Sequence, residues 1–284
     1  MPVSHIRRTF SRLLRKTKSW ATIVGLTLQG NSVNKEAKLK NCKTPVLMIY
    51  GFGATRPTLA ILEKRLKQDG YTIFSLNLGG IFDTFNTDSI EDVSRRLDEK
   101  IERLYKKYTF RGRLSIIGHS KGGLIGNYYV KRLGGAKRVK TLITLGSPHN
   151  GNPWAMIAAY TPVAWICKSL QQMNPMSRFI KDLKAIPFPK ALKVFSIYSK
   201  SDSICPFPVA VLDENENVKN IEVYGLSHSE LLIKKNVYNA IKHALRDEMP
   251  QSWEDVSRQN IKDHIEEKKN SKLRLISGIK GQFV

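Results

Sequence analysis

The chain has 284 residues, of which 41% are hydrophobic and 25% charged, a globular composition that excludes a disordered or collagen-like chain. It carries 47 Lys and Arg against 24 Asp and Glu, a formal net charge of +23. Such a charge points to nucleic acid, an anionic membrane or an acidic substrate, without choosing among them. The length fits one or two domains, and we favour one domain with appendages.

The three cysteines, Cys42, Cys167 and Cys205, form no CxxC pair. This sparse set argues against a disulfide framework and against a zinc site. We therefore expect a reducing compartment, and we assign neither a metal nor an organic cofactor.

The first 40 residues are predicted to be a basic amphipathic segment. No acidic residue precedes Glu36, whereas Arg7, Arg8, Arg12, Arg15, Lys16 and Lys18 all do. Six residues, all but Thr17 apolar, follow the spacing of one helical face: Ile6, Phe10, Leu13, Leu14, Thr17 and Ala21. We interpret the segment as a contact with an anionic membrane surface, in a cytoplasmic protein that is peripheral on the membrane. An organellar transit peptide, a secretory signal and a solvated tail stay open as alternatives.

Residues 41–250 are predicted to form an α/β domain. Short apolar runs alternate there with longer amphipathic stretches, the pattern of βα units around a mostly parallel sheet flanked by helices. The predicted strands are 45–50, 72–78, 114–117, 139–145, 192–198 and 220–224. The predicted helices are 58–68, 89–108, 122–133 and 229–245, the third ended by Gly134 and Gly135.

Residues 151–190 lie between two predicted strands and are interpreted as a cap or lid insertion that covers one edge of the sheet. The stretch 150–167 has no charged residue, but prolines interrupt it and it is shorter than the roughly 20 residues of a membrane span. We predict that Trp154, Ile157 and Trp165 bind substrate, and packing of these aromatics in the core is the alternative. Residues 251–284 are predicted to be a peripheral helix and a basic tail.

The sharpest chemical signal is Gly118-His119-Ser120-Lys121-Gly122, which lies between a predicted strand and a predicted helix. A G-x-S-x-G sequence in that setting is typical of a nucleophile elbow, a strained turn that exposes the serine hydroxyl. Glycines on both sides of the serine remove Cβ atoms that would collide in so tight a turn. A purely structural glycine-rich turn is the alternative.

A serine hydroxyl needs a base, and the base needs a carboxylate that orients it, in the chain order serine, acid, histidine. We predict His228 as the base because it lies just after the last predicted strand, in a loop that could bring it over the edge of the sheet. His243 lies within a predicted helix, and His264 lies in the tail. A fourth downstream histidine, His149, is considered below.

We predict Asp202 as the acid, because it follows the strand 192–198 directly. Asp213 and Glu214 are rivals, in a polar segment that is typical of an exposed turn. The oxyanion hole is assigned to two backbone N–H groups, those of Lys121 and of Phe52 in the loop after the first strand.

The segments VLMIYGFG, IIGHSKGG and LGSPHNG, with the loops of Asp202 and His228, occur in the order found in the α/β-hydrolase superfamily. The chain resembles the lipases and esterases of that superfamily over residues 45–246. The resemblance implies an α/β-hydrolase fold and hydrolysis of carboxylic esters through an acyl-enzyme. In that family the histidine of the third segment is usually structural, so His149 is not assigned to catalysis. The chain departs from the family where Tyr50-Gly51 replaces His-Gly in the oxyanion loop.

We therefore predict a serine hydrolase that cleaves carboxylic esters, with lipid acyl esters as the favoured substrate. A thioesterase or an acyltransferase with the same three side chains is an alternative, because the resemblance does not distinguish them. A non-catalytic protein that binds lipid or a partner is a second alternative. A nucleic-acid partner is not expected, because the basic residues are not interleaved with an aromatic reader motif.

Overall fold

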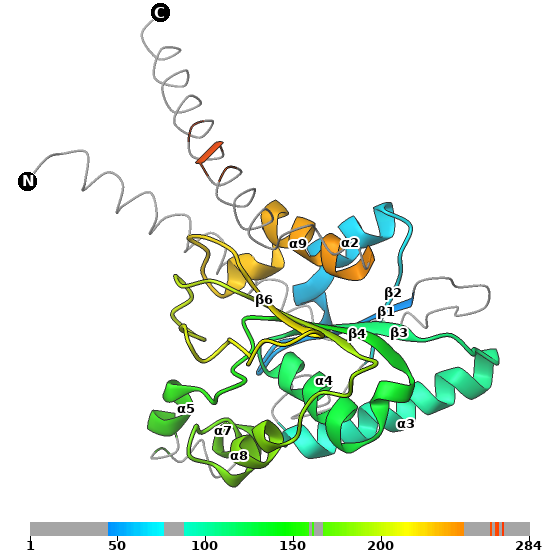
Figure 1. Ribbon diagram of the computed structural model, residues 1–284, viewed down its shortest axis with the longest axis horizontal. Coiled ribbons are helices and arrows are strands. Elements are labelled where there is room, and N and C mark those ends of the chain that lie inside the picture. The colour runs from blue at the N-terminus through cyan, green and yellow to red at the C-terminus, as the bar shows by residue number, and fades with distance from the viewer. Residues whose placement is uncertain are drawn as a thin grey trace, which may run out of the picture.

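The computed structural model describes residues 45–76, 88–158, 161 and 167–246, with residues 262, 265, 266 and 269 (Figure 1). The predictions for residues 1–40 and for Trp165 lie outside the described residues. In the segment 251–284 the four described residues are helical, and the rest of that prediction also lies outside.

Six parallel strands form one sheet in the order β2-β1-β3-β4-β5-β6. Their bounds are β1 Pro45–Ile49, β2 Thr72–Ser75, β3 Leu114–His119, β4 Val139–Leu145, β5 Lys193–Tyr198 and β6 Val218–Glu222. The predicted parallel sheet is thus confirmed, although β3 continues two residues beyond its prediction to His119. Every residue of β1 and β3 is buried, as expected of parallel strands covered on both faces.

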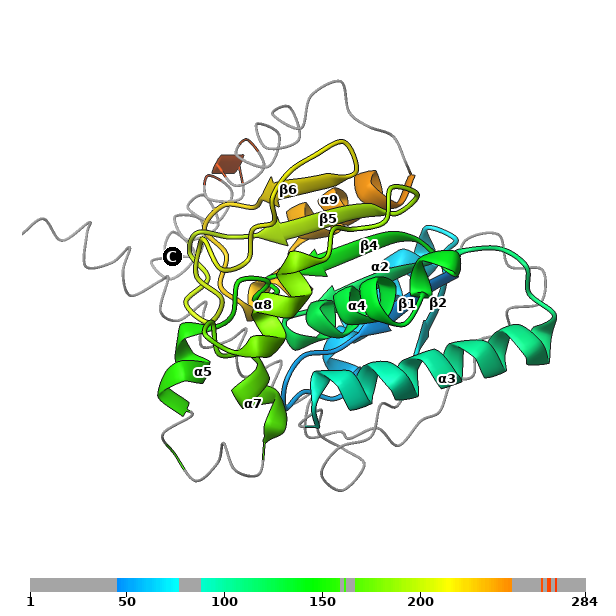
Figure 2. The same cartoon turned by 60° about the horizontal axis from the view of Figure 1, so that its bottom comes forward.

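Helices cover both faces of the sheet (Figures 1 and 2). One face carries α3 (Ile90–Tyr108), α4 (Lys121–Arg132) and α8 (Arg178–Ala185), and the other carries α2 (Ala60–Gln68) and α9 (Lys235–Arg246). Short 3-10 turns, η1 (Arg56–Leu59), η2 (Gly135–Lys137) and η3 (Ser229–Leu232), complete the chain path. Strand β1 shows how the two cores form, since Leu47 packs in one apolar cluster and Met48 in the other.

The helix boundaries follow the local signals expected from the sequence. Helix α3 begins after Ser89, whose hydroxyl accepts a hydrogen bond from the Asp92 amide at 3.1 Å. Helix α4 ends at Arg132, and Gly134 then takes a left-handed conformation with φ 72°. The glycines therefore end this helix, as predicted.

The insertion between β4 and β5 contains α5 (Pro153–Ala158), α7 (Lys168–Gln172) and α8, at the carboxyl ends of the central strands and over the α3–α4 face (Figure 2). Its inner side packs in the core through Ala155, Met173, Ile180 and Leu183. Trp154, in contrast, is 55% exposed, so core packing is the wrong interpretation for this aromatic residue. No helix within the described part of the chain is long and apolar enough to cross a bilayer.

The junction of α4 with β1 depends on a residue without a side chain. A Cβ at Gly122 would lie 2.3 Å from the Ile49 carbonyl oxygen, a backbone atom that cannot move alone. We expect Gly122→Ala to lower the free energy of unfolding by about 1–3 kcal/mol, despite the higher helix propensity of alanine.

Urea denaturation measures this change. Gly126→Ala in the same helix is the matched control, because its Cβ would meet only side-chain atoms, Leu142 Cδ1 at 2.9 Å and Ile116 Cγ2 at 3.4 Å. Equal unfolding midpoints for the two variants would contradict the close approach of α4 and β1.

Candidate active site

Ser120 lies at the turn between β3 and α4 in a backbone conformation that L-residues rarely adopt, with φ 53° and ψ −125°. Two backbone hydrogen bonds hold it there. The Ser120 amide donates to the Leu145 carbonyl at 2.9 Å, and the Ser120 carbonyl accepts from the Gly123 amide at 3.0 Å. Because Ser120 caps α4, its side chain stands at the positive end of the helix dipole.

The turn is possible only because glycines surround it. A Cβ at Gly118 would lie 2.6 Å from the backbone of Gly122, and one at Gly122 would lie 2.3 Å from the Ile49 carbonyl oxygen, which explains both glycines of the motif. A Cβ at Gly51 would lie 3.0 Å from the Cβ of Ser120. Gly51 therefore lets the loop after β1, which carries the half-buried Phe52, approach the serine closely. The presence of Tyr50 in place of the family's histidine does not prevent this close approach of the loop to Ser120.

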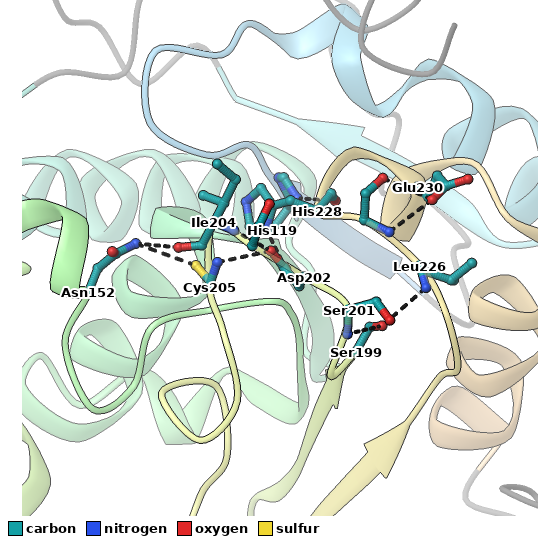
Figure 3. Close-up of polar contacts among 12 residues, drawn as sticks. His119, Asn152, Ser199, Ser201, Asp202, Ile204, Cys205, Leu226, His228 and Glu230 are labelled. Atoms are coloured by element: carbon teal, nitrogen blue, oxygen red, sulfur yellow. Dashed lines mark hydrogen bonds and ion pairs between the residues drawn. The ribbon is translucent and has the colours of Figure 1, made fainter. Parts of the chain in front are cut away.

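Asp202 and His228 form a close pair at the carboxyl edge of the sheet (Figure 3). The His228 Nδ1 lies 2.7 Å from the Asp202 Oδ2, and the Asp202 side chain is fully buried. The other carboxylate oxygen, Oδ1, accepts the amides of Ile204 at 2.8 Å and Cys205 at 2.9 Å. These bonds fix the carboxylate, so that it can orient the imidazole.

The rival residues lie elsewhere. Asp213 is exposed, and Glu214 accepts a hydrogen bond from the Asn220 amide at 2.7 Å, in the loop before β6. His243 lies in α9, as predicted, and His264 is outside the described residues.

The end of β4 brings the serine and the Asp202–His228 pair to one place. Leu145 holds the Ser120 amide, and a Cβ on the next residue, Gly146, would lie 2.9 Å from the Asp202 Oδ2 and 3.2 Å from the His228 Nδ1. Since Nδ1 faces Asp202, Nε2 is on the opposite side of the ring.

The Ser120 hydroxyl itself is within hydrogen-bonding reach of the Cys205 thiol. Among the described residues, no hydrogen bond joins that hydroxyl to His228. Burial raises the pKa of the Cys205 thiol well above its usual value, so the thiol is neutral.

Two residues that the sequence analysis did not assign hold the loop of His228. The His119 Nε2 lies 3.3 Å from the His228 carbonyl oxygen, with ring centroids 4.5 Å apart. Burial, followed by repulsion from His228, lowers the pKa of His119 well below its usual value, so its ring is neutral. Glu230 is fully buried, and its Oε2 accepts from both the amide and the hydroxyl of Ser227 at 2.9 Å (Figure 3).

The contacts between Ser227 and Glu230 close a turn that contains His228. The Ser-x-x-Glu spacing of a capping box was visible in the sequence and could have identified Glu230. The contact of His119 with His228, which joins residues 109 positions apart, had no sequence signal.

The two residues of the predicted oxyanion hole are also linked by a side chain. Lys121 is fully buried, its Nζ donates to the Asp88 carbonyl at 2.5 Å, and the same atom lies 5.9 Å from the ring centroid of Phe52. Burial lowers the pKa of the Lys121 ammonium group to about 7. The Lys121 amide begins α4, directly after the serine.

Two of the three predicted substrate-binding residues, Trp154 and Ile157, lie on α5. Trp154 donates through Nε1 to the Ser203 carbonyl at 2.8 Å, which ties α5 to the loop of Asp202. Ile157 is 61% exposed. Within the described ranges, no three or more His, Cys, Asp or Glu side chains are grouped so that they could hold a metal ion.

His149 lies in the core, away from the Asp202–His228 pair. Its Nε2 is 2.9 Å from the Thr144 hydroxyl oxygen, and its Nδ1 is 3.5 Å from the Asn127 Nδ2. Burial lowers the pKa of His149 from 6.5 to about 3. A buried, neutral and hydrogen-bonded ring fits the structural role that the resemblance implied.

Residues 45–186, half of the chain, match the model of the palmitoyl protein thioesterase family. Similar solved structures include the mature lipase BlEst2 of Bacillus licheniformis, at 15% identity and a TM-score of 0.60 over 76% of this chain and 96% of that one. Aspergillus fumigatus lipase B is 19% identical, with a TM-score of 0.60 over 76% of this chain and 55% of that one. Phospholipase PlaB of Legionella pneumophila is 14% identical, with a TM-score of 0.54 over 78% and 62%.

These structures share the fold of this chain, a parallel sheet flanked by helices, so the predicted α/β-hydrolase fold is confirmed. The predicted resemblance to lipases and esterases of the α/β-hydrolase type is confirmed with it.

The buried His149 predicts a pH dependence of stability. The folded protein keeps this ring neutral down to about pH 3, whereas the unfolded chain protonates it near pH 6.5. Its contribution to stability is therefore fully present above pH 6.5 and is lost as the pH falls below that value, by about 1.4 kcal/mol per pH unit. Urea denaturation measures the free energy of unfolding at pH 7 and at pH 5. The two values should differ less in His149→Gln than in the original chain.

The ring resonances of His149 provide a second measurement that needs no variant. They should not shift in an NMR titration between pH 8 and pH 5. A midpoint near pH 6.5 would contradict the buried neutral ring.

Proposed function

We propose that this chain, which belongs to the palmitoyl protein thioesterase family, is a serine hydrolase that cleaves lipid acyl thioesters with Ser120 as its nucleophile. The family favours a thioester as the substrate over an oxyester. The sequence by itself favours the oxyester, with a thioesterase as an alternative. The observation that carries the proposal is the 2.7 Å pair of His228 and buried Asp202, against the strand end that also holds Ser120.

In this mechanism the Ser120 hydroxyl turns from the Cys205 thiol toward the His228 Nε2. As the Ser120 Oγ attacks the acyl carbonyl carbon, Nε2 takes the hydroxyl proton, and Asp202 stabilises the imidazolium that forms. The negative charge moves to the carbonyl oxygen, where the amides of Phe52 and Lys121 donate to it. The positive end of α4 adds to this stabilisation.

Collapse of the tetrahedral intermediate breaks the carbon–sulfur bond, and the proton on His228 goes to the departing sulfur. The acyl group stays on the Ser120 oxygen. Water, deprotonated by His228, then attacks the acyl-enzyme, and the fatty acid leaves as Ser120 recovers its proton. A thiol has a pKa of about 8.5, so a thioester needs less proton assistance to leave than an alkyl oxyester does.

The reaction class is tested with a matched pair of substrates, an S-palmitoyl and an O-palmitoyl peptide of otherwise equal sequence. We expect the higher kcat/KM on the thioester. We also expect Ser120→Ala to lower kcat by at least about 10³-fold and to abolish labelling by a fluorophosphonate.

The exposed Ser203 supplies the control, since Ser203→Ala should keep both labelling and turnover. Labelling of Ser120→Ala at the original level would rule out Ser120 as the nucleophile. A higher kcat/KM on the O-palmitoyl peptide would restore the oxyester as the substrate class.

We also propose that Glu230 is a positioning residue for His228. Glu230→Leu removes the acceptor of both Ser227 hydrogen bonds, whereas Glu230→Gln keeps an acceptor oxygen at the same place. Displacement of a reacting group by about 1 Å can cost about 100-fold in rate, so we expect Glu230→Leu to lower kcat by about 10–100-fold with little change in KM.

Glu230→Gln should restore most of the lost kcat. Glu216→Leu, at an exposed glutamate, controls for the change of charge and should leave kcat unchanged. A loss that appears in KM, or one that glutamine does not rescue, would exclude positioning through Ser227.

A further inference from the structure

Five exposed apolar side chains lie on α5 and on the loop of Asp202, and we call them the apolar rim. They are Trp154 at 55%, Met156 at 42%, Ile157 at 61%, Ile204 at 38% and Phe207 at 46% exposure. Within the described part of the chain, the other large apolar side chains that are comparably exposed are Met176 and Ile265. Exposed apolar surface is therefore concentrated on two segments, a distribution that marks an interaction site.

The two segments of the apolar rim are held together and lie beside Ser120. Trp154 bonds to the Ser203 carbonyl at 2.8 Å, and the Asn152 Nδ2 donates to the Ile204 carbonyl at 3.0 Å (Figure 3). The next residue, Cys205, reaches the Ser120 hydroxyl. A surface that covers the apolar rim would therefore also face the nucleophile.

The insertion that carries α5, residues 151–190, has five Lys and Arg against one acidic residue, Asp182. No Asp or Glu occurs between Glu102 and Asp182, a stretch that includes all of α5 and α7. Within the same insertion Lys168 and Lys181 are exposed. Lys200, which is paired with Glu222 at 2.9 Å, also places its Nζ 5.3 Å from the ring centroid of Phe207.

We propose that the apolar rim docks on the surface of a bilayer that contains anionic phospholipid, so that Ser120 receives acyl chains from the membrane. This rests on the proposed function. Tryptophan and other large apolar side chains enter the boundary between headgroups and acyl chains, while lysines remain at the level of the headgroups. The formal charge of +23 attracts the protein to such a surface.

A bilayer fits these observations better than a protein partner does. Protein interfaces are depleted in lysine at their centre, and they require a complementary shape. Lipid accepts side chains of any shape, and an insertion with five basic residues against one acidic residue is attracted to anionic headgroups.

The test measures cosedimentation of the full chain with vesicles of phosphatidylcholine alone and of phosphatidylcholine with phosphatidylserine. We expect binding to the mixed vesicles, and at least about tenfold weaker binding for the double variant Met156→Ser/Phe207→Ser, because two exposed apolar side chains that would enter the bilayer are lost. Met176→Ser, which removes an exposed methionine of the insertion outside the apolar rim, is the matched control and should bind like the original chain.

Turnover separates docking from chemistry. The double variant should keep its activity on a soluble short-chain acyl thioester and lose it on a palmitoyl thioester embedded in vesicles. If no acyl thioester is cleaved by the original chain, the proposed function fails, while sedimentation still tests docking.

Three results would overturn the membrane proposal. The first is equal vesicle binding by the original chain and the double variant. The second is an equal loss of binding in Met176→Ser. The third is that analytical ultracentrifugation finds the original chain dimeric and the double variant monomeric. The apolar rim would then bind a second copy of this chain.

Discussion

Ser120 occupies a conformation with φ 53° and ψ −125°, and the geometry of the site follows from the contacts that permit it. The conformation is strained for a residue with a side chain, so it persists only because the surrounding structure enforces it. Leu145 binds the Ser120 amide, and glycines at positions 118, 122 and 51 let the neighbouring backbones come close. The hydroxyl is thereby presented at the centre of the sheet, at the positive end of α4.

The loop of His228 is held from several directions, which fixes the orientation of its ring. Asp202 contacts the ring, His119 contacts the backbone carbonyl, and Glu230 closes the turn around Ser227. The hydroxyl of Ser199 accepts the Leu226 amide at 3.2 Å and so joins this loop to the end of β5. The contacts come from β3, from the loops after β5 and β6, and from η3, so the carboxyl edge of the sheet organises them together.

The insertion after β4 has two sides with opposite chemistry. Its inner side contributes Met173, Ile180 and Leu183 to the core, and the Tyr128 and Phe179 rings stack with centroids 5.7 Å apart. Its outer side presents the apolar rim beside Ser120. The proposed function requires access for acyl chains at Ser120, and an apolar surface supplies a path for them.

The sequence by itself determined the strands, and to within two residues the boundaries of α2, α3 and α4, because buried parallel strands are continuous apolar runs and because caps such as Ser89 and Gly134 act locally. It predicted none of the helices of the insertion, and α9 begins at Lys235, six residues after its predicted start. The sequence also singled out Ser120, Asp202 and His228 as the candidate catalytic residues, since the elbow and the strand ends are local patterns. Only the tertiary structure placed Cys205 against Ser120 and His119 against His228. It also decided that Trp154 faces outward, because burial depends on which distant segments pack against a residue, and periodicity along the chain carries no information about them.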